Sequence, residues 1–524
     1  METPSDIATS RCVIGSLPAT TERNTSERRL NSDDRALNSR QRPVRALAST
    51  PLPLLKRLSN SISPGRTIVS SDAFSVLDST ELTTFHRKVT VLSAAGMFLD
   101  GFDITVIAVA LPTVTKQWHL STFMAGALSA AAVVGMFVGA LVFGRLTDRL
   151  GRKKMYLVNL IGFVFFALVA ALAQDAWQLL VCRFLLGLAL GADYTISTSL
   201  LAEYAPAQRR GSLMCRLGAT WFVGAATTYA FALALLPLGD AMWRVMLVLG
   251  AVFALIVLWM RRSIPESPRW LAAQGRGEEA NAVLTGLGDA TARLSGPAAP
   301  QHDSPWRTLL TMPLLRYTFF CCGFWFMYTL SYYGITLYTP TILKQVTTST
   351  TGTYTGSLII ALVGVAGAFT GVALVDRVGR RPLLIVGFIG MFLALTVLAL
   401  WQNPGLTGLV VLLGAAVLFA NSGPGIVNLV YPSEVFPTAV RATANGLGTA
   451  VSRIGAIIGT LWLPTLIKSW GLHHVLWLFV GASVIGLTIA ATLAPETKGR
   501  PLEELSAEIS GRAQSGSAAP ESVG

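Results

Sequence analysis

The chain has 524 residues, of which 52% are hydrophobic and only 13% charged, and its mean hydropathy is +0.55. A water-soluble protein carries about 25% charged residues to cover its surface, so the composition excludes a soluble globular protein. A formal net charge of +13 would also suit a nucleic-acid-binding protein. Whether it has that meaning here depends on where the basic residues lie along the chain.

Twelve apolar segments follow one another along the chain, each long enough to cross roughly 30 Å of hydrocarbon as a helix of about 20 residues. The alternating polarity of membrane β-barrel strands is absent from runs such as 384–400. We therefore predict an all-α membrane protein. Its predicted transmembrane helices span 89–112, 123–143, 155–174, 177–201, 212–236, 242–261, 315–338, 354–375, 381–401, 407–430, 440–466 and 472–494.

Three polar segments divide the chain. The first is rich in Ser, Arg, Thr and Asp and is predicted to be a disordered tail, and the last is rich in Ser, Ala and Gly and is predicted to be flexible. The middle segment is a linker in which Gly275–Leu287 can form an amphipathic helix. The predicted parts are an N-terminal tail over 1–85, six-helix bundles over 86–262 and 313–505, a linker over 263–312 and a C-terminal tail over 506–524.

Three short charged motifs of the first half recur in the second half at nearly one spacing. Asp148-Arg149-Leu150-Gly151-Arg152 returns as Asp376-Arg377-Val378-Gly379-Arg380, Glu203 returns as Glu434, and Pro265-Glu266-Ser267 returns as Pro495-Glu496-Thr497. Each motif follows an apolar segment. Secondary transporters are built from such internal repeats, with the substrate site between them. The duplication therefore predicts two pseudo-symmetric bundles and a transport function.

Lys and Arg gather in the loops after even-numbered segments, whereas the opposite loops hold only isolated lysines. The positive-inside rule places the basic loops and both termini in the cytoplasm. This asymmetry accounts for the net charge, and no nucleic-acid partner is predicted. The basic residues concerned are Arg145, Arg149, Arg152, Lys153, Lys154, Arg209, Arg210, Arg261, Arg262, Arg269, Arg377, Arg380 and Arg381.

The sequence lacks the residue patterns of an enzyme or a metalloprotein. Its five cysteines are unpaired by spacing and its five histidines lie near helix ends or in loops, so neither a disulfide framework nor a metal site is predicted. No Ser/His/Asp set lies at mid-membrane, and no phosphate-binding Gly-x-x-x-x-Gly-Lys loop is present. We predict no cofactor, no enzymatic activity and no nucleotide-driven transport.

Several motifs of the sequence resemble those of a known family. Gly144-Arg145-Leu146-Thr147-Asp148-Arg149-Leu150-Gly151-Arg152-Lys153-Lys154 is similar to the loop motif of the major facilitator superfamily. Arg183 with Gly187 and Gly191, Pro265-Glu266-Ser267-Pro268-Arg269-Trp270 and Pro495-Glu496-Thr497-Lys498-Gly499 resemble marks of its sugar-porter-like branch. The resemblance covers about 89–505. It implies two six-helix bundles that rock about a central site lined by helices 1, 4, 7 and 10.

Within that branch, two runs resemble different groups of proton symporters. Gly191-Ala192-Asp193-Tyr194 is similar to a run of phosphate:proton symporters, and Asp100-Gly101-Phe102-Asp103 is similar to one of aromatic-acid and metabolite:proton symporters. Thr329 stands where the phosphate family has an acid, and Thr195 replaces its usual Pro. The overall resemblance is to bacterial metabolite:proton symporters, which implies a multi-pass protein of the bacterial inner membrane.

The repeated motifs predict a gating network on one membrane face. Asp148 lies where it can meet a helix N-terminus, whose partial positive charge favours a carboxylate, and Arg149 and Arg152 can bind Glu203. Such a network would hold this face shut and break when it opens; anchoring of loops to lipid head groups is the alternative. Its predicted members are Asp148, Arg149, Arg152, Glu203, Asp376, Arg377, Arg380, Glu434 and Arg441.

Carboxylates near the middle of the apolar segments are candidates for proton coupling. Asp100 and Asp103 are three residues apart and share a helix face, and Asp193 lies deep in the fourth segment. A carboxylate in lipid is costly unless it is protonated or paired, so such residues usually face a cavity and have a function. The alternative for Asp193 is a structural ion pair with Arg183 or Arg216.

The seventh apolar segment is unusually aromatic, which suggests that it lines the substrate site. Trp325, Tyr328 and Tyr332 share one helix face, whereas Tyr338 is expected at the membrane interface. Arg453 can pair with one of the buried acids, bind an anionic substrate or make an interhelix hydrogen bond. Trp221 can add a hydrogen bond to the substrate. The predicted substrate-binding residues are Tyr194, Trp325, Tyr328, Thr329, Tyr333, Asn421, Asn428 and Arg453.

The predicted function is secondary active transport of a small organic solute, such as a metabolite, an organic or aromatic acid or a sugar. Buried acids favour proton symport by alternating access over a uniporter. An inorganic phosphate:proton symporter and a non-transporting nutrient receptor of the same fold are the alternatives. We expect a monomer whose partners are the solute, protons and the lipid bilayer.

Overall fold

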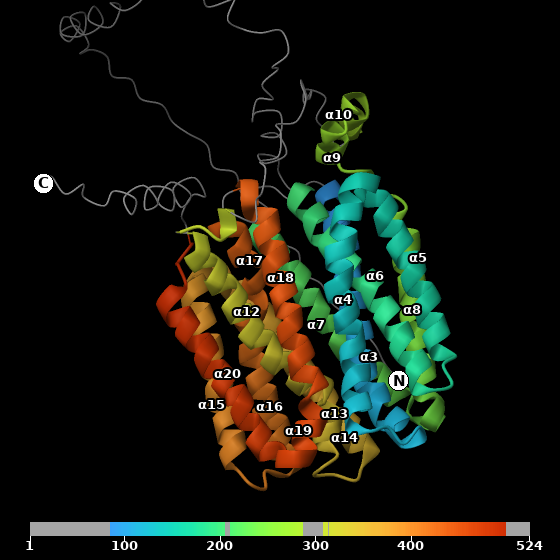
Figure 1. Cartoon of the computed structure of the whole chain (residues 1–524), viewed down its shortest axis with the longest axis vertical. Helices are drawn as coiled ribbons and strands as arrows, with labels where there is room; N and C mark the ends of the chain where they lie inside the picture. The colour runs from blue at the N-terminus through green and yellow to red at the C-terminus, as the bar shows by residue number, and fades with distance from the viewer. Residues whose placement is uncertain (1–83, 205–209, 287–307, 313, 437, 499–524) are drawn as a thin grey trace, which may run out of the picture. The chain divides into compact units, whose positions relative to one another are not determined.

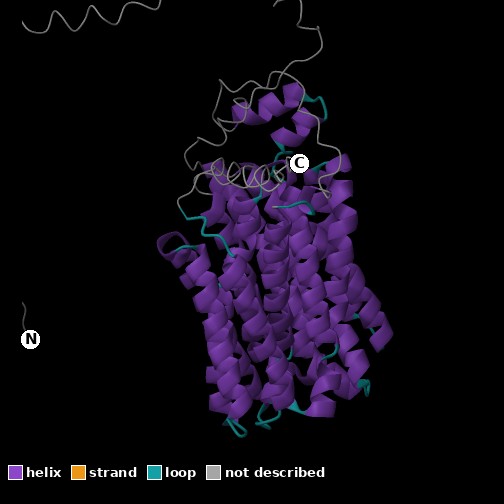
Figure 2. Cartoon of the chain, turned by 60° about the vertical axis from the view of Figure 1, so that its left-hand side comes forward, coloured by secondary structure: helices purple, strands orange, loops and turns teal. Residues whose placement is uncertain are grey.

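The computed structural model describes residues 84–204, 210–286, 308–312, 314–436 and 438–498, and no strand occurs within these ranges. Nearly all of the two predicted tails and a large part of the linker lie outside the described residues. Long helices lie side by side in the remainder (Figure 2).

Each half of the chain contributes six long helices, counting α16 and α17 as one interrupted helix (Figure 1). Those of the N-terminal half are α3 (Thr84–Gln117), α4 (Thr122–Leu150), α5 (Arg152–Ala171), α6 (Ala176–Tyr204), α7 (Arg210–Ala234) and α8 (Met242–Arg261). Those of the C-terminal half are α12 (Leu314–Leu337), α14 (Thr350–Val378), α15 (Arg380–Leu400), α16 (Gly405–Ser422) with α17 (Pro424–Val435), α18 (Thr438–Leu461) and α20 (Leu472–Leu493).

Ten described helices are long and apolar enough to cross a membrane, and α18 with α19 (Leu463–Trp470), bent by 40°, makes an eleventh span. Helix α12 is not among these eleven, because its many tyrosines lower its hydropathy. It is as long as the others and packs against α18 and α20 within the same bundle, so it is the twelfth of the predicted spans. Large apolar side chains such as Phe165, Trp259 and Leu400 are exposed on the outer faces, where lipid would contact them.

The predicted boundaries need three corrections. Arg145 and Arg149 belong to the last turns of α4, so only Gly151 separates α4 from α5. The tenth span is interrupted at Gly423. The predicted linker helix is α10 (Gly277–Gly286), and it is preceded by a short α9 (Pro268–Ala273) that the sequence analysis did not predict. Short segments η3 (Leu236–Ala241) and α13 (Thr339–Leu343) occupy loops.

The internal repeat is also present in the local geometry. Ser121 caps α4 by accepting from Met124 N, and Ser349 caps α14 by accepting from Gly352 N. Gly151 and Gly379, which join the second and third helices of each half, have φ of 97° and 106°. Only glycine adopts such angles readily. The same chain reversal is therefore built twice.

The two halves contact each other at the end that carries Ser121 and Ser349, which we call the capped end. Helix α4 packs on α18, and α7 packs on α14. Tyr354 Oη donates to Val109 O at 3.1 Å, and Tyr229 Oη donates to Thr336 O at 3.2 Å. At the opposite, charged end, near Gly151 and Gly379, α7 packs on α17. The halves therefore enclose the space between them.

Close helix approach inside the N-terminal bundle depends on glycine. A Cβ atom at Gly101 of α3 would lie 1.9 Å from Trp221 O of α7, whereas one at Gly162 of α5 would meet nothing within 4 Å. Small residues allow this contact in lipid. We expect Gly101→Val to abolish most of the monodisperse protein in size-exclusion chromatography, and Gly162→Val to leave it unchanged. Equal yields of the two variants would contradict this packing argument.

Candidate functional site

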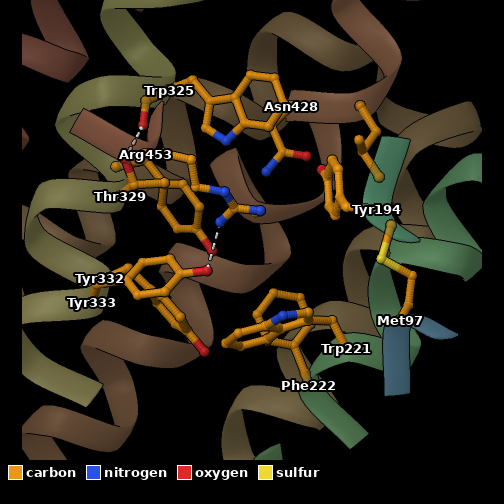
Figure 3. Close-up of a pocket in the computed structure, with 14 residues that line it drawn as sticks. Met97, Tyr194, Trp221, Phe222, Trp325, Thr329, Tyr332, Tyr333, Asn428 and Arg453 are labelled. Carbon is orange, nitrogen blue, oxygen red and sulfur yellow. Dashed lines mark hydrogen bonds between the residues drawn. The ribbon is translucent and has the colours of Figure 1, made fainter. Parts of the chain in front are cut away.

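A cavity lies between the two halves, near the middle of the helices. It leaves about 60 Å³ for the centres of water-sized molecules, which is enough for only a few waters. A solute must therefore push its lining apart. Figure 3 shows the cavity, whose lining comprises Met97, Tyr194, Gly218, Trp221, Phe222, Trp325, Tyr328, Thr329, Tyr332, Tyr333, Gly425, Asn428, Leu429 and Arg453.

Seven of the eight predicted substrate-binding residues line this cavity; the eighth, Asn421, does not. Helices α3, α6 and α7 contribute one wall, and α12, α17 and α18 contribute the other. Met97, Phe222 and Tyr332 were not among the predicted binding residues. Tyr332 follows from the predicted face of α12, but nothing in the sequence singles out Met97 or Phe222.

Arg453 is the only arginine or lysine in this lining. It is 6% exposed, and its Nη1 donates to Tyr333 Oη at 2.9 Å. The guanidinium carbon lies 5.1 Å from the centre of the Tyr194 ring, so the cation joins α18 to α6 across the cavity (Figure 3). A desolvated guanidinium of this kind suits recognition of a carboxylate.

Aromatic rings form much of the remaining wall. Tyr328 and Tyr332 stack with ring centres 5.4 Å apart, and Trp221 lies 6.0 Å from both Tyr332 and Tyr333. Thr329 donates to Ser452 O at 2.7 Å and so ties α12 to α18. The rings offer flat faces on which a planar or partly apolar solute can pack.

A second, smaller cavity lies toward the capped end. Trp221, Phe222 and Tyr332 line both cavities and separate them. Asn421 lines the second cavity, where its Nδ2 donates to Gly364 O at 3.1 Å. Thr105, Thr336 and Ser357 line the same space. The rings of Trp221, Phe222 and Tyr332 therefore form a partition between the central cavity and the capped end.

Two of the three buried acids form ion pairs. Asp103 Oδ2 lies 2.8 Å from Arg183 Nη1, and both side chains are 1% exposed. Asp193 binds Arg261 through both carboxylate oxygens. The suggested partners of Asp193, Arg183 and Arg216, are wrong: Asp193 pairs with Arg261, and Arg183 binds Asp103.

Arg261 is buried at the last turn of α8. Its side chain stacks on Tyr156, with the guanidinium carbon 3.6 Å from the ring centre, and donates to Leu92 O at 3.3 Å. A Cβ at Gly96 would lie 2.0 Å from Arg261 Nη2, so the guanidinium occupies the space that a side chain at this position would need. Arginine, tyrosine and aspartate thus link α3, α5, α6 and α8.

Asp100 differs from the other two acids. It is 0% exposed, and neither of its carboxylate oxygens has a hydrogen-bond partner among the described residues. It interacts electrostatically with Arg453 and Arg261. An ionised carboxylate without a hydrogen bond is expensive to bury, which sets Asp100 apart from the two acids that have an arginine partner.

The C-terminal half carries a charge network at the charged end. Arg380 lies 2.9 Å from Glu434 and 3.0 Å from Asp376. Thr497 donates to Glu434 at 2.5 Å, and Lys498 donates to Arg377 O at 2.6 Å. Arg441 donates to Phe436 O at 3.2 Å. Four of the predicted gating residues therefore belong to this network: Asp376, Arg380 and Glu434 through their side chains, and Arg377 through its backbone carbonyl. A fifth, Arg441, binds the backbone of Phe436 near the network.

In the N-terminal half, the side chains of Asp148 and Glu203 lie outside the described residues, and Arg149 is exposed. The backbone N–H groups of Arg152 and Lys153 donate to Glu266 at 2.9 and 3.2 Å. Those of Arg380 and Arg381 donate to Glu496 at 3.1 Å. The two glutamates belong to motifs that resemble those of a known family, but their capping of α5 and α15 was not predicted from the sequence.

Two other expectations concern single side chains. Tyr338 does not face lipid as an interfacial residue would, because it is 1% exposed and donates to Thr460 O at 3.0 Å. Four cysteines, Cys182, Cys215, Cys321 and Cys322, are free, and Cys12 lies outside the described residues. No metal-binding group of His, Cys, Asp and Glu occurs in the described part of the chain.

The family model described as "Sugar (and other) transporter" matches residues 88–509. The chain belongs to this family. It is 32% identical to "Putative metabolite transport protein YaaU" of Escherichia coli (strain K12), covering 82% of this chain and 96% of that protein. It is 30% identical to "Inner membrane metabolite transport protein YgcS" of the same organism, covering 81% and 95%.

A solved structure gives the same fold. The xylose transporter XylE from E. coli, in a partially occluded inward-open conformation, superposes with a TM-score of 0.67 at 22% identity, covering 80% of this chain and all of the other. The predicted major facilitator fold of two six-helix bundles is confirmed. The chain is an integral, multi-pass membrane protein of a family of sugar and metabolite transporters, and its relatives are not enzymes.

Proposed function

We propose that this protein is a proton-coupled secondary transporter of a small organic solute, and that it works by alternating access. The observation that carries the proposal is the cavity between the halves, which combines aromatic walls with one buried guanidinium. The two halves supply opposite walls, so rocking one half against the other would open the cavity to either side.

The chemistry of the cavity favours an organic monoanion. Arg453 supplies a desolvated donor for one carboxylate, and Trp325 and Tyr333 supply faces for a ring. Inorganic phosphate is the second candidate, but none of the described residues that line the cavity is an acid. A phosphate dianion would also bring two charges to a single cation. A neutral sugar would use Thr329 and Asn428 and depend less on Arg453.

The basic loops favour an orientation with both termini in the cytoplasm, and relatives from E. coli favour a bacterial inner membrane. In this orientation the Arg380–Glu434 pair lies on the cytoplasmic face. The network belongs to the C-terminal half but abuts α7 of the other half, because a Cβ at Gly211 would lie 3.5 Å from Glu434. It would therefore help to close that face.

We expect Glu434→Gln to weaken this closure, because the pair with Arg380 is partly buried. Loss of about 1 kcal/mol would raise the open population roughly fivefold. Cys215 of α7 is 1% exposed and lies within electrostatic range of both residues, so its maleimide labelling should accelerate several-fold. Cys322, in α12, should label at an unchanged rate. Unaltered labelling of Cys215 would argue against a gating role.

Uptake into proteoliposomes tests the proposed function. Benzoate, D-xylose and inorganic phosphate would be offered as radiolabelled solutes, with and without an inward proton gradient. We expect benzoate to accumulate only with the gradient. Accumulation of phosphate alone would favour the second candidate, and equal uptake with and without the gradient would indicate a uniporter. Binding without any transport would indicate a receptor.

A further inference from the structure

The central cavity and the second cavity follow one another along the same two helices. On α7 the lining runs from Gly218 in the central cavity to Tyr229 in the second, and on α12 it runs from Trp325 to Thr336. Each stretch rises roughly 16 Å at about 1.5 Å per residue. The three rings of the partition belong to both linings. The two cavities are therefore parts of one tract that the partition interrupts.

The two parts of this tract differ in charge. Arg453 lines the central cavity and donates to Tyr333 Oη at 2.9 Å (Figure 3). The Tyr333 ring centre lies 6.0 Å from that of Trp221 in the partition, so the cation contacts a ring that is adjacent to the partition. Beyond the partition, none of the described residues that line the second cavity is charged.

The side chains of the second cavity also have few hydrogen-bond donors to spare. Six of the residues that line it donate from their side chains to backbone carbonyl groups. Five of the six are hydroxyl groups, and each has thereby used its one proton and can offer a ligand only lone pairs. The six residues are Thr105, Tyr229, Thr336, Thr339, Ser357 and Asn421.

We infer that the two cavities form one substrate site with two unlike ends. Arg453 binds the carboxylate, and the second cavity takes the opposite end of the solute, which is uncharged and donates a hydrogen bond. This inference rests on the proposed function and narrows its substrate class to organic acids that carry a hydroxyl group far from the carboxylate.

The size of the cavities agrees with a shared solute. The second cavity leaves about 30 Å³ for the centres of water-sized molecules, so neither cavity alone has room for more than a few waters. A solute held by Arg453 would displace the rings of the partition and join the two cavities. The rings would then pack against the middle of the solute, between its two polar ends.

Competition binding to the purified full-length protein tests the inference with three benzoates of similar size. These are 4-methylbenzoate, 4-(hydroxymethyl)benzoate and terephthalate. We expect 4-(hydroxymethyl)benzoate to bind roughly 2- to 10-fold more tightly than 4-methylbenzoate, the gain from one additional hydrogen bond. Terephthalate should bind about tenfold more weakly than 4-methylbenzoate, because its second carboxylate would lose water without meeting a cation.

A variant that fills the second cavity locates the hydroxyl group. Ala361 of α14 lines the second cavity and not the central one. Ala361→Leu should bring the ratio of the affinities for 4-(hydroxymethyl)benzoate and 4-methylbenzoate to about one. Ala373→Leu, at an exposed position of the same helix, is the matched control and should keep the wild-type ratio. Arg453→Gln should weaken both ligands by one factor, because it acts on their common end.

Two results would overturn the inference. A preference for 4-(hydroxymethyl)benzoate that is absent from the wild type, or that persists in Ala361→Leu, would show that the second cavity does not take the hydroxyl group. Terephthalate that binds more tightly than the other two would show that the second cavity holds an anion. Both results leave the proposed transport of organic monoanions intact. If none of the three benzoates binds, the proposed function fails and the inference with it, so the two failures are distinguishable.

Discussion

Replacing Arg261 by leucine is expected to destabilise the protein by about 3–5 kcal/mol, the usual effect of leaving one charge of a buried ion pair without its partner. Asp193 is 3% exposed, and Arg261 is its ion-pair partner. The substitution also removes the guanidinium that stacks on Tyr156 and donates to Leu92 O. The thermal denaturation midpoint of the purified protein measures the effect.

Two further variants separate charge from packing. Arg262→Leu changes the adjacent, exposed arginine and should shift the midpoint little, because surface substitutions are usually within about 0.5 kcal/mol of neutral. The double variant Asp193→Asn/Arg261→Leu removes both charges and should recover much of the lost stability. If Arg261→Leu and Arg262→Leu denature at the same temperature, the buried pair does not stabilise the bundle.

Arg261 also illustrates a limit of sequence-based prediction. It ends an apolar segment beside Arg262 and so was counted among the basic loop residues that set orientation. Its burial depends on Gly96, whose missing side chain leaves room for the guanidinium, and on Asp193, 68 residues earlier in the chain. Neither periodicity nor hydropathy reports such a convergence of separate helices.

The glutamates of the repeated Pro-Glu motifs show the same limit. Their recurrence was visible in the sequence, but their role was not, because the groups they bind are backbone N–H groups. Glu266 caps α5 from 114 residues away, and Glu496 caps α15 from 116. A helix N-terminus attracts a carboxylate whatever its side chains are, so the partner leaves no mark in the sequence.

Local patterns were sufficient elsewhere. Spans of about 20 apolar residues predicted the helices, since lipid forces every backbone group into an internal hydrogen bond. The spacing of Trp325 and Tyr328 placed them on one face of α12, and both line the cavity. Arg453 was recognisable as a cation within an apolar segment, where a charge usually marks function. Its neighbour Tyr194 shares the cavity because the bundles face each other, whereas Tyr333 lies on α12 of the same bundle as Arg453.

Replacing Arg453 by glutamine is expected to weaken benzoate binding by about 1.5–3 kcal/mol, the range for hydrogen bonds to charged groups, or roughly 10- to 150-fold in affinity. Arg453 is 6% exposed, so water would not replace its contact with a carboxylate. D-Xylose, which has no charge, should lose much less. Competition binding at low pH measures both ligands on one preparation.

Arg453→Lys and Tyr333→Phe refine the assignment. Lysine keeps the charge but loses the two-pronged geometry of the guanidinium, so benzoate affinity should fall between wild type and Arg453→Gln. Tyr333→Phe removes the hydroxyl that accepts from Arg453 at 2.9 Å and leaves the cation freer for the anion, so affinity should stay level or rise. If Arg453→Gln lowers benzoate and D-xylose affinity equally, Arg453 acts by holding α18 to α12, and the anion must bind elsewhere.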